Sequence, residues 1–392
     1  MIRAALALAV CAAAVRADEA PNPARSSPPA ARVSVQEALE TGVQWLIEHQ
    51  NKDGSFGTSA SGRPWGLSCS VPGGHQAFRT ASTALCYMGL LDAGVDVPGR
   101  EETARKTLAF LTEHGLVKRA SGRELYNVWS HGYSLRALAQ ALRQKAPGAD
   151  PEAIRHKARD LIKAIGVLQS TEGGFGYYDF NTKAYKPSWS TPFTTATVLI
   201  GLQEARAEGL EVPQKMIDDS VKNILLARKK DGSYLYGYYL RWRPVRGINQ
   251  PKGSSLRTQA CNMALYRAGH TVTKEDLRIG LGHLVQHHRF AVAGVGRPIP
   301  HESWYQVSGY FYLYGHQYAA MVLEQLDEAD KERYWPKVVE FTLKCRRPDG
   351  SFWDYPVYGY HKAYGTGYAL MTLARCPKPI AGKIDPAKQK PE

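Results

Sequence analysis

The sequence predicts an all-α protein that folds as a closed toroid of six inner and six outer helices. Two repeated motifs and one contrast between helices support this fold class. A glycine-containing loop motif recurs at spacings of 59 residues or about twice that, and a Thr/His-x6-Leu motif occurs six times. Helical segments that are apolar all round also alternate with amphipathic ones. Repeats of this length indicate units that bury their faces against neighbouring units.

The loop motif consists of an acidic residue, a glycine directly after it, and an aromatic residue two positions beyond the glycine. Its four copies are QNKDGSFG from Gln50, QSTEGGFG from Gln169, RKKDGSYL from Arg228 and RRPDGSFW from Arg346. Their acidic residues are separated by 119, 59 and 118 positions, which indicates six units with degenerate copies near residues 112 and 290. We expect the glycines to adopt turn conformations that fold the aromatic side chains onto the next helix pair.

The second motif marks the inner helices. Each copy has Thr or His first and Leu at the seventh step, and the surrounding residues are apolar on almost every side, which is typical of a buried helix. We predict that the inner helices begin near Thr83, His131, Thr195, Thr258, His316 and Thr366 and bury Leu90, Leu138, Leu202, Leu265, Leu323 and Leu373.

The outer helices are predicted from segments that carry one apolar stripe and one charged face. These segments cover residues 36–50, 101–114, 151–169, 213–228, 274–288 and 330–345. An open solenoid would show one-sided polarity on both helices of each pair and polar caps at its ends, so the contrast favours a closed ring. In that ring, the loop motifs and the starts of the inner helices lie on one face.

The two ends of the chain differ from the repeat region in composition. Residues 1–17 have a positive start, an apolar run and small residues before position 18, so we predict a signal peptide cleaved after Ala17 and an exported protein, periplasmic or extracellular. A frayed helix is the alternative for this segment. Residues 18–33 and 377–392 are expected to be a disordered tether and a disordered tail, which leaves 34–376 as the toroid domain.

Five cysteines remain after the predicted cleavage, and an exported protein could oxidise them. At most two disulfides could form, and the sequence leaves the pairing open. The spacing matches no zinc or haem motif. These cysteines are Cys69, Cys86, Cys261, Cys345 and Cys376.

The pattern Gln50-x3-Gly54-x-Phe56, repeated from Gln169, resembles the QW repeats of terpenoid cyclases and protein prenyltransferase β-subunits. The resemblance covers residues 34–376 and implies an α/α-toroid with a functional central cavity, often an isoprenoid site. The catalytic motifs of these families are missing, however. No acidic residue occurs in the four positions before any predicted inner helix, and the chain has no Asp-x-Cys pair. His361 lies near the last inner helix, but the zinc ligand would be expected at Gly365. The sequence thus predicts no metal and no cofactor.

Positive charge gathers at the predicted cavity mouth. Lys and Arg number 50 against 36 Asp and Glu, a net charge of +14, but no long basic run suggests nucleic-acid binding. Cations at helix starts are unfavourable unless an anion accompanies them. The cations could pair with carboxylates such as Glu124, Asp179, Glu302 or Asp354, or they could bind an anionic ligand. The candidate ligand-binding residues are Arg79, His131, Arg257, His316, Lys362, Tyr314 and Tyr364.

Tyrosine-rich loops between the helices suit a sugar or an isoprenoid chain equally well. The sequence therefore favours a monomeric toroid that binds an anionic, isoprenoid-like or glycan ligand without cyclase or zinc chemistry. The alternative is a cavity enzyme, either a terpenoid cyclase-like transferase or isomerase or a polysaccharide lyase-like protein, whose catalytic residues the sequence does not identify. No nucleic-acid partner is expected. No membrane span is expected either, because no segment outside the N-terminus reaches 18 apolar residues.

Overall fold

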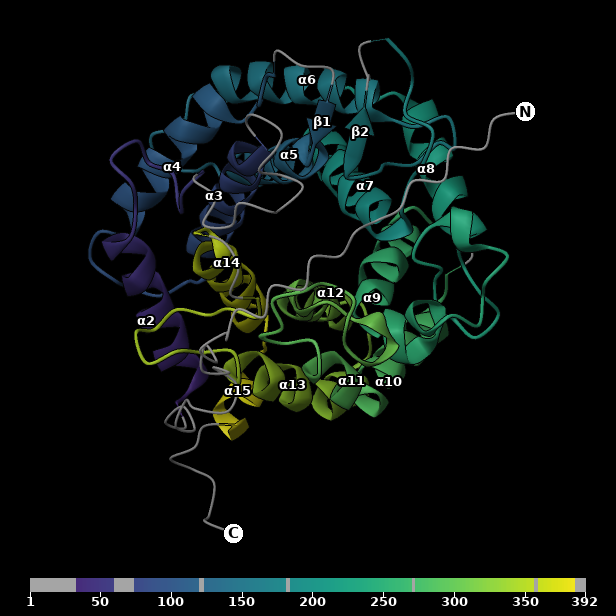
Figure 1. Ribbon diagram of the computed structural model, residues 1–392. Helices are drawn as coiled ribbons and strands as arrows, with labels where there is room; N and C mark the ends of the chain where they lie inside the picture. The colour runs from purple at the N-terminus through teal and green to yellow at the C-terminus, as the bar shows by residue number, and fades with distance from the viewer. Residues whose placement is uncertain are drawn as a thin grey trace, which may run out of the picture.

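The computed structural model describes residues 33–59, 74–119, 123–180, 184–269, 272–355 and 359–384. Within these ranges the regular secondary structure is almost entirely helical, and an outer set of helices surrounds an inner ring (Figure 1). The inner helices are α3 (Gly74–Asp92), α5 (Asn127–Arg143), α7 (Pro192–Ala207), α9 (Pro251–Arg267), α12 (Tyr312–Leu323) and α14 (His361–Ala374). The outer helices are α2 (Val35–Glu48), α4 (Arg100–His114), α6 (Pro151–Leu168), α8 (Gln214–Leu226), α10 (Lys274–Gln286) and α13 (Glu328–Leu343).

Each inner helix packs against the next one along the chain, and the last inner helix, α14, packs against the first, α3. Glycines allow this last contact to be close, because a Cβ atom on Gly89 would lie 3.1 Å from the backbone oxygen of Gly367. The leucines of the Thr/His-x6-Leu motif are all buried, as predicted: Leu90, Leu138, Leu202, Leu265, Leu323 and Leu373.

The inner helices begin earlier than the sequence predicts. Thr195 lies three residues after the first residue of α7, and Thr83 lies nine residues after that of α3. The first turns of α3 contain His75, Gln76 and Arg79, so they lack the apolar pattern on which the prediction rests. Prolines begin α7 and α9, where the missing amide hydrogen costs no helical bond.

The loop motif is structural, as predicted. Gly54, Gly173, Gly232 and Gly350 all have φ between 77° and 84°, a region that favours glycine. The aromatic residue that follows is fully buried in each copy. In three copies its backbone N–H donates to the threonine hydroxyl of the adjacent inner helix: Phe56 to Thr83 (3.0 Å), Phe175 to Thr195 (2.9 Å) and Phe352 to Thr366 (3.0 Å). The repeated threonine is thus the acceptor that holds these three loops on the inner ring.

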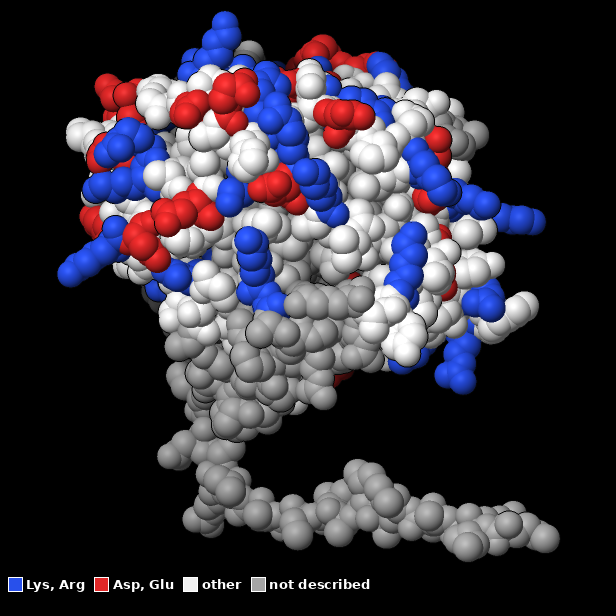
Figure 2. All heavy atoms as spheres, turned by 90° about the horizontal axis from the view of Figure 1, so that it is seen from above, with Lys and Arg blue, Asp and Glu red and all other residues white. Residues whose placement is uncertain are grey.

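The outer wall carries the charged residues. On the face shown in Figure 2, Lys and Arg are interspersed with Asp and Glu rather than gathered in one basic patch. The outer helix α6 is capped by Asp150, which accepts hydrogen bonds from the Glu152 and Ala153 amides, and α10 begins with a capping box formed by Thr273 and Asp276. Charged residues that face solvent also make these helices amphipathic.

Two features add to the predicted fold. Strands β1 (Arg123–Leu125) and β2 (Tyr178–Phe180) form a short antiparallel ribbon at the cavity mouth. The sequence predicts a disordered tail from residue 377, and this is wrong for its first part, because helix α15 (Lys378–Ile384) packs against α13 and buries Ile380. In the described ranges, every helix is too short or too polar to span a lipid bilayer.

Candidate functional site

The inner helices and the loops at their N-terminal ends enclose a cavity of about 330 Å³. Helices α3, α5, α7, α12 and α14 contribute side chains to its wall, and the β1–β2 ribbon places Tyr126, Tyr177 and Tyr178 beside it. Fifteen of the 21 residues that line the cavity are Phe, Tyr or Trp. The wall described by the structure contains no Asp, Glu, Asn, Gln, Lys or Arg. The site is therefore an aromatic chamber whose polar groups are mainly phenol hydroxyls.

Four of the lining residues form a polar cluster on one wall, here called the His301 cluster: Tyr177, Tyr236, His301 and Tyr310. The hydroxyls of Tyr177 and Tyr236 are 2.6 Å apart. His301 Nε2 lies 3.3 Å from the Tyr310 hydroxyl and 3.5 Å from the Tyr236 hydroxyl. Its Nδ1 is 2.9 Å from the backbone oxygen of Gln306, so Nδ1 carries the hydrogen and Nε2 is the acceptor.

Burial keeps the His301 cluster uncharged. It lowers the pKa of His301, and the nearby charge of Arg257 lowers it further. Burial raises the pKa of Tyr310 to about 12 and that of Tyr236 well above its ordinary value. At neutral pH the cluster therefore offers phenol hydrogens and one imidazole lone pair. His301 also has a φ of 63°, a strained value for a residue other than glycine.

Arg257 lies behind this wall, with only 2% of its surface exposed. Its guanidinium carbon is 5.1 Å from the ring centre of Tyr236, 5.2 Å from that of Phe311 and 5.7 Å from that of Phe193. The guanidinium donates to the backbone oxygens of Gly253 (3.0 Å) and Ile248 (2.7 Å). No carboxylate of the described residues pairs with it, so the positive charge is stabilised by carbonyl dipoles and ring faces alone.

Asp354 is a fully buried acid next to the cavity. Its Oδ2 accepts the Leu313 amide at the start of α12 (2.8 Å), and its Oδ1 accepts the hydroxyl of Tyr364 (2.8 Å), which lines the cavity. Burial raises the pKa of Asp354 to about 7, although both hydrogen bonds act in the opposite direction. A carboxyl group with this pKa can exchange its proton near neutral pH.

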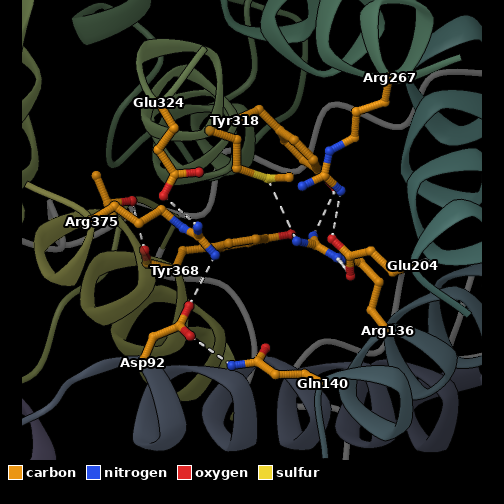
Figure 3. A network of polar contacts seen from close by, with 11 residues as sticks. Asp92, Arg136, Gln140, Glu204, Arg267, Tyr318, Glu324, Tyr368 and Arg375 are labelled. Carbon is orange, nitrogen blue, oxygen red and sulfur yellow. Dashed lines mark hydrogen bonds and ion pairs between the residues drawn. The ribbon is translucent and has the colours of Figure 1, made fainter. Parts of the chain in front are cut away.

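A polar network joins residues at or near the C-terminal ends of the inner helices (Figure 3). Glu204 of α7 accepts Arg136 Nε (3.1 Å) and Arg267 Nη1 (2.8 Å). Although burial raises the pKa of Glu204, these two cations lower it to about 2. Arg136 Nη1 also donates to the Tyr318 hydroxyl (3.4 Å), which connects the network to the tyrosines at the cavity floor.

The second half of the network surrounds Arg375. This side chain bridges Asp92 (3.1 Å) and Glu324 (2.8 Å), and Asp92 also accepts Gln140 Nε2 (2.6 Å) (Figure 3). Two ion pairs therefore join the ends of α3, α12 and α14, and the hydrogen bond from Gln140 adds α5. The charges of Arg375, Asp92 and Glu324 compensate one another.

The predicted cations of the mouth do not act together. Arg79 pairs with Asp53 at 2.5 Å and Lys362 pairs with Asp349 at 2.5 Å, so the acidic residues of the loop motif are their partners. The expected partner Glu302 instead lies 3.6 Å from Arg297, and the side chain of Glu124 lies outside the described residues. Local carboxylates compensate the charges of Arg79 and Lys362, which removes the reason for expecting an anion there.

The remaining predicted residues separate into two groups. His131 and His316 are buried, and burial lowers the pKa of each to about 4, so neither adds positive charge. His316 Nδ1 contacts the backbone oxygen of Tyr312 (2.7 Å), and its Nε2 is buried with no hydrogen-bond partner among the described residues. Tyr314 and Tyr364, in contrast, line the cavity.

His301 and Tyr236 are cavity residues that no sequence motif marks. Both lie in the long aromatic-rich loops that the sequence does single out, but no spacing rule links positions 65 residues apart to one wall. Arg257 was singled out as a candidate ligand-binding residue because it directly precedes Thr258, a predicted helix start. The described residues contain no group of three or more potential His, Cys, Asp or Glu metal ligands. Of the cysteines, Cys86, Cys261, Cys345 and Cys376 have free, buried thiols, whereas Cys69 lies outside the described residues.

This chain resembles known proteins in its fold. No family model matches the chain, and no curated protein matches it. Among solved structures, a variant of the type II terpene cyclase MstE from Scytonema, in complex with merosterolic acid A, is 14% identical with a TM-score of 0.52, over 87% of this chain and 96% of that one. A D-mannose isomerase is 10% identical with a TM-score of 0.56, over 89% and 97% of the two chains. An inactive variant of an α-1,6-mannanase from Salegentibacter, in complex with α-1,6-mannotriose, is 11% identical with a TM-score of 0.57, over 87% and 99%. The chain is thus an α/α-toroid repeat protein.

Proposed function

We propose that the protein binds an elongated apolar molecule of the isoprenoid type in its central cavity. The observation that carries this proposal is the aromatic lining of the chamber, to which Tyr314 and Tyr364 contribute. Its volume of about 330 Å³ falls at the lower end of the range common for small-molecule sites. Aromatic rings gain favourable free energy when apolar groups cover them, and their faces attract the electron-poor edges of other groups.

A glycan ligand is less well supported. Sugars present many hydroxyls, and a site that buries them needs matching side-chain donors and acceptors. Among the described residues, the lining has no carboxylate or side-chain amide, and several of its phenol hydroxyls bond one another or nearby backbone. Examples are Tyr177 with Tyr236 and Tyr314 with the backbone oxygen of Phe193 (3.1 Å). Buried sugar hydroxyls would therefore lose more hydrogen bonds to water than the chamber replaces.

A second candidate function is catalysis in the cavity, and Asp354 favours it. Tyr364 donates to Asp354 Oδ1 in the structure. When Asp354 is protonated, the direction of this bond can reverse, so that the acid proton passes to the Tyr364 oxygen while the phenol hydrogen is delivered to a ligand double bond. The alkene carbon gains a C–H bond. A neighbouring carbon then loses a proton to the Tyr364 oxygen, the phenol proton returns to the Asp354 carboxylate, and the product is an isomer of the ligand. This corresponds to the isomerase alternative of the sequence analysis and requires no metal.

The test is direct binding to the purified protein. Farnesol should quench the fluorescence of Trp129, which lines the cavity, and α-1,6-mannotriose should not. Replacement Trp129→Phe should remove the quenching signal while calorimetry still detects binding. Binding of mannotriose without binding of farnesol would overturn the proposal. Farnesol recovered from heavy water distinguishes the two functions, because deuterium on carbon that is lost in the Asp354→Asn variant would establish the catalytic one.

We also propose that the protein acts outside the cytoplasm as a monomer, after cleavage following Ala17. The composition of the first 17 residues supports export. Residues 1–32 lie outside the described residues, so N-terminal sequencing of the mature protein is the measurement that decides this point.

A further inference from the structure

We propose that the ligand of the cavity carries one small acidic group, such as a carboxylate, and that this group binds at the His301 cluster in front of Arg257. The inference rests on the proposed function, because it names the polar end of the same apolar ligand. The sequence predicts an anion site at the cavity mouth, whereas the site proposed here lies inside the chamber.

Arg257 carries a positive charge that no carboxylate of the described residues compensates. A buried charge without a counter-ion is costly, and the equally buried Arg136 has Glu204 as its counter-ion. Arg257 has only two backbone oxygens and three ring faces, and its Nε has no partner among the described residues. Because the Tyr236 ring separates it from the cavity, an anion beside the Tyr236 hydroxyl would lie one side-chain layer away.

Phenol hydroxyls at the same wall can donate hydrogen bonds to a ligand. His301 Nε2 offers one lone pair to two phenol hydroxyls, those of Tyr236 and Tyr310, and both contacts are longer than a usual O–H···N bond. At least one phenol hydrogen therefore remains available to an oxygen atom in the cavity. Neutral donors around a fixed positive charge are well suited to a carboxylate, which accepts hydrogen bonds only.

The loop that carries His301 holds its imidazole in a fixed orientation. Backbone and side-chain contacts hold His301, because its amide donates to Ser308 Oγ (3.1 Å) and its Nδ1 contacts Gln306. The loop carries left-handed backbone at His301, Tyr305 and Gln306. Such strain persists only where the surrounding structure imposes it, and it gathers at functional sites. Here it aims the imidazole at the phenol hydroxyls on the cavity wall.

Two probes that share one apolar chain separate the polar end from the rest. Farnesoic acid and farnesol should both bind, and the acid should bind about ten-fold more tightly at neutral pH. The preference should persist at high salt, because a buried charge is screened far less than an exposed one. If neither probe binds, the proposed function fails. If both bind equally well, the acidic-group inference fails while apolar binding stands.

Variants locate the acidic group. Tyr310→Phe and His301→Gln should reduce the affinity for farnesoic acid to that for farnesol and leave farnesol binding unchanged. Arg257→Met should do the same if it folds, and the Tyr310→Phe result decides the question if it does not. Tyr312→Phe is the matched control, because its buried hydroxyl contacts His288 and the backbone of Phe341 outside the cavity. A preference for the acid that survives Tyr310→Phe and His301→Gln would overturn the inference.

Discussion

Two acidic residues five positions apart illustrate how burial sets charge at the residue scale. Asp349 is partly exposed and, although its partial burial raises its pKa, hydrogen bonds from Lys362 and Ser351 lower the value to about 2. Asp354 is fully buried, and its pKa rises to about 7. The same side chain is therefore a structural anion in one place and a proton carrier in the other.

The two residues should respond to pH in opposite ways. Folded protein keeps the Asp354 proton up to about pH 7, whereas unfolded chain releases it near the ordinary value of 3.8. The contribution of Asp354 to stability is thus greatest below that value and falls as the pH rises to about 7, by roughly 4 kcal/mol at most. We expect Asp354→Asn to be more stable than the wild type at pH 7.5 in urea unfolding and to lose this pH dependence.

Asp349→Asn is the matched comparison. The folded pKa of Asp349 lies below its unfolded value, so its stabilising effect is present above about pH 4 and is lost as the pH falls towards 2. This variant should be less stable than the wild type at pH 7.5. If Asp354→Asn also lost stability at that pH, the buried group would be a stabilising anion rather than a neutral acid.

At the element scale, the glycine of the loop motif allows each loop to approach an outer helix. The approach is not equally close in every repeat. A Cβ atom on Gly54 would lie 2.3 Å from the backbone oxygen of Lys106, whereas one on Gly232 would lie 3.1 Å from the Ile279 side chain. Backbone cannot yield as a side-chain methyl group can, so the repeats should tolerate substitution to different degrees.

We expect Gly54→Ala to lower the melting temperature more than Gly232→Ala. Both variants place a Cβ on a left-handed backbone, which costs about 1 kcal/mol or more, and only the first adds a backbone clash. Gly282→Ala in α10 is the control, since nothing lies within 4 Å of its added methyl and alanine favours a helix. Farnesol affinity should be unchanged in all three variants. Loss of binding at unchanged stability would show that the loops belong to the ligand site.

At the scale of the whole molecule, the two ends of the ring are built differently. The N-terminal ends of the inner helices and their loops line the aromatic chamber, whereas the C-terminal ends carry ion pairs that connect helices distant in sequence. Glu204 alone joins α7 to α5 and α9 through Arg136 and Arg267.

Removing that anion should affect the whole ring. We expect Glu204→Gln to reduce the free energy of unfolding by about 3–5 kcal/mol, because it leaves Arg136 buried without a counter-ion. The exposed pair of Glu102 and Arg105 on α4 provides the control, and Glu102→Gln should change stability little. Urea unfolding followed by circular dichroism measures both. Equal effects would mean that the network contributes no more than a surface ion pair.

The sequence by itself determined the repeat, the class of each helix and the residues that hold the loops. Periodic apolar residues report which helix faces must leave water, and a turn that needs positive φ selects glycine, so both are local properties. Tyr314 and Tyr364 were also singled out, because they lie near the starts of predicted inner helices, and both line the cavity. The ligand-binding role of these residues and of Arg257 stays a prediction.

Only the tertiary structure decided which charges remain available. Arg79 and Arg257 look alike in sequence, yet Arg79 reaches an acid 26 residues away and Arg257 reaches none among the described residues. His301 and Tyr236 meet on one wall only because the ring brings two long loops together. Whether a buried group is compensated depends on its neighbours in space, and the physical reason is that desolvation and Coulomb attraction act over ångströms of distance rather than over positions in the chain.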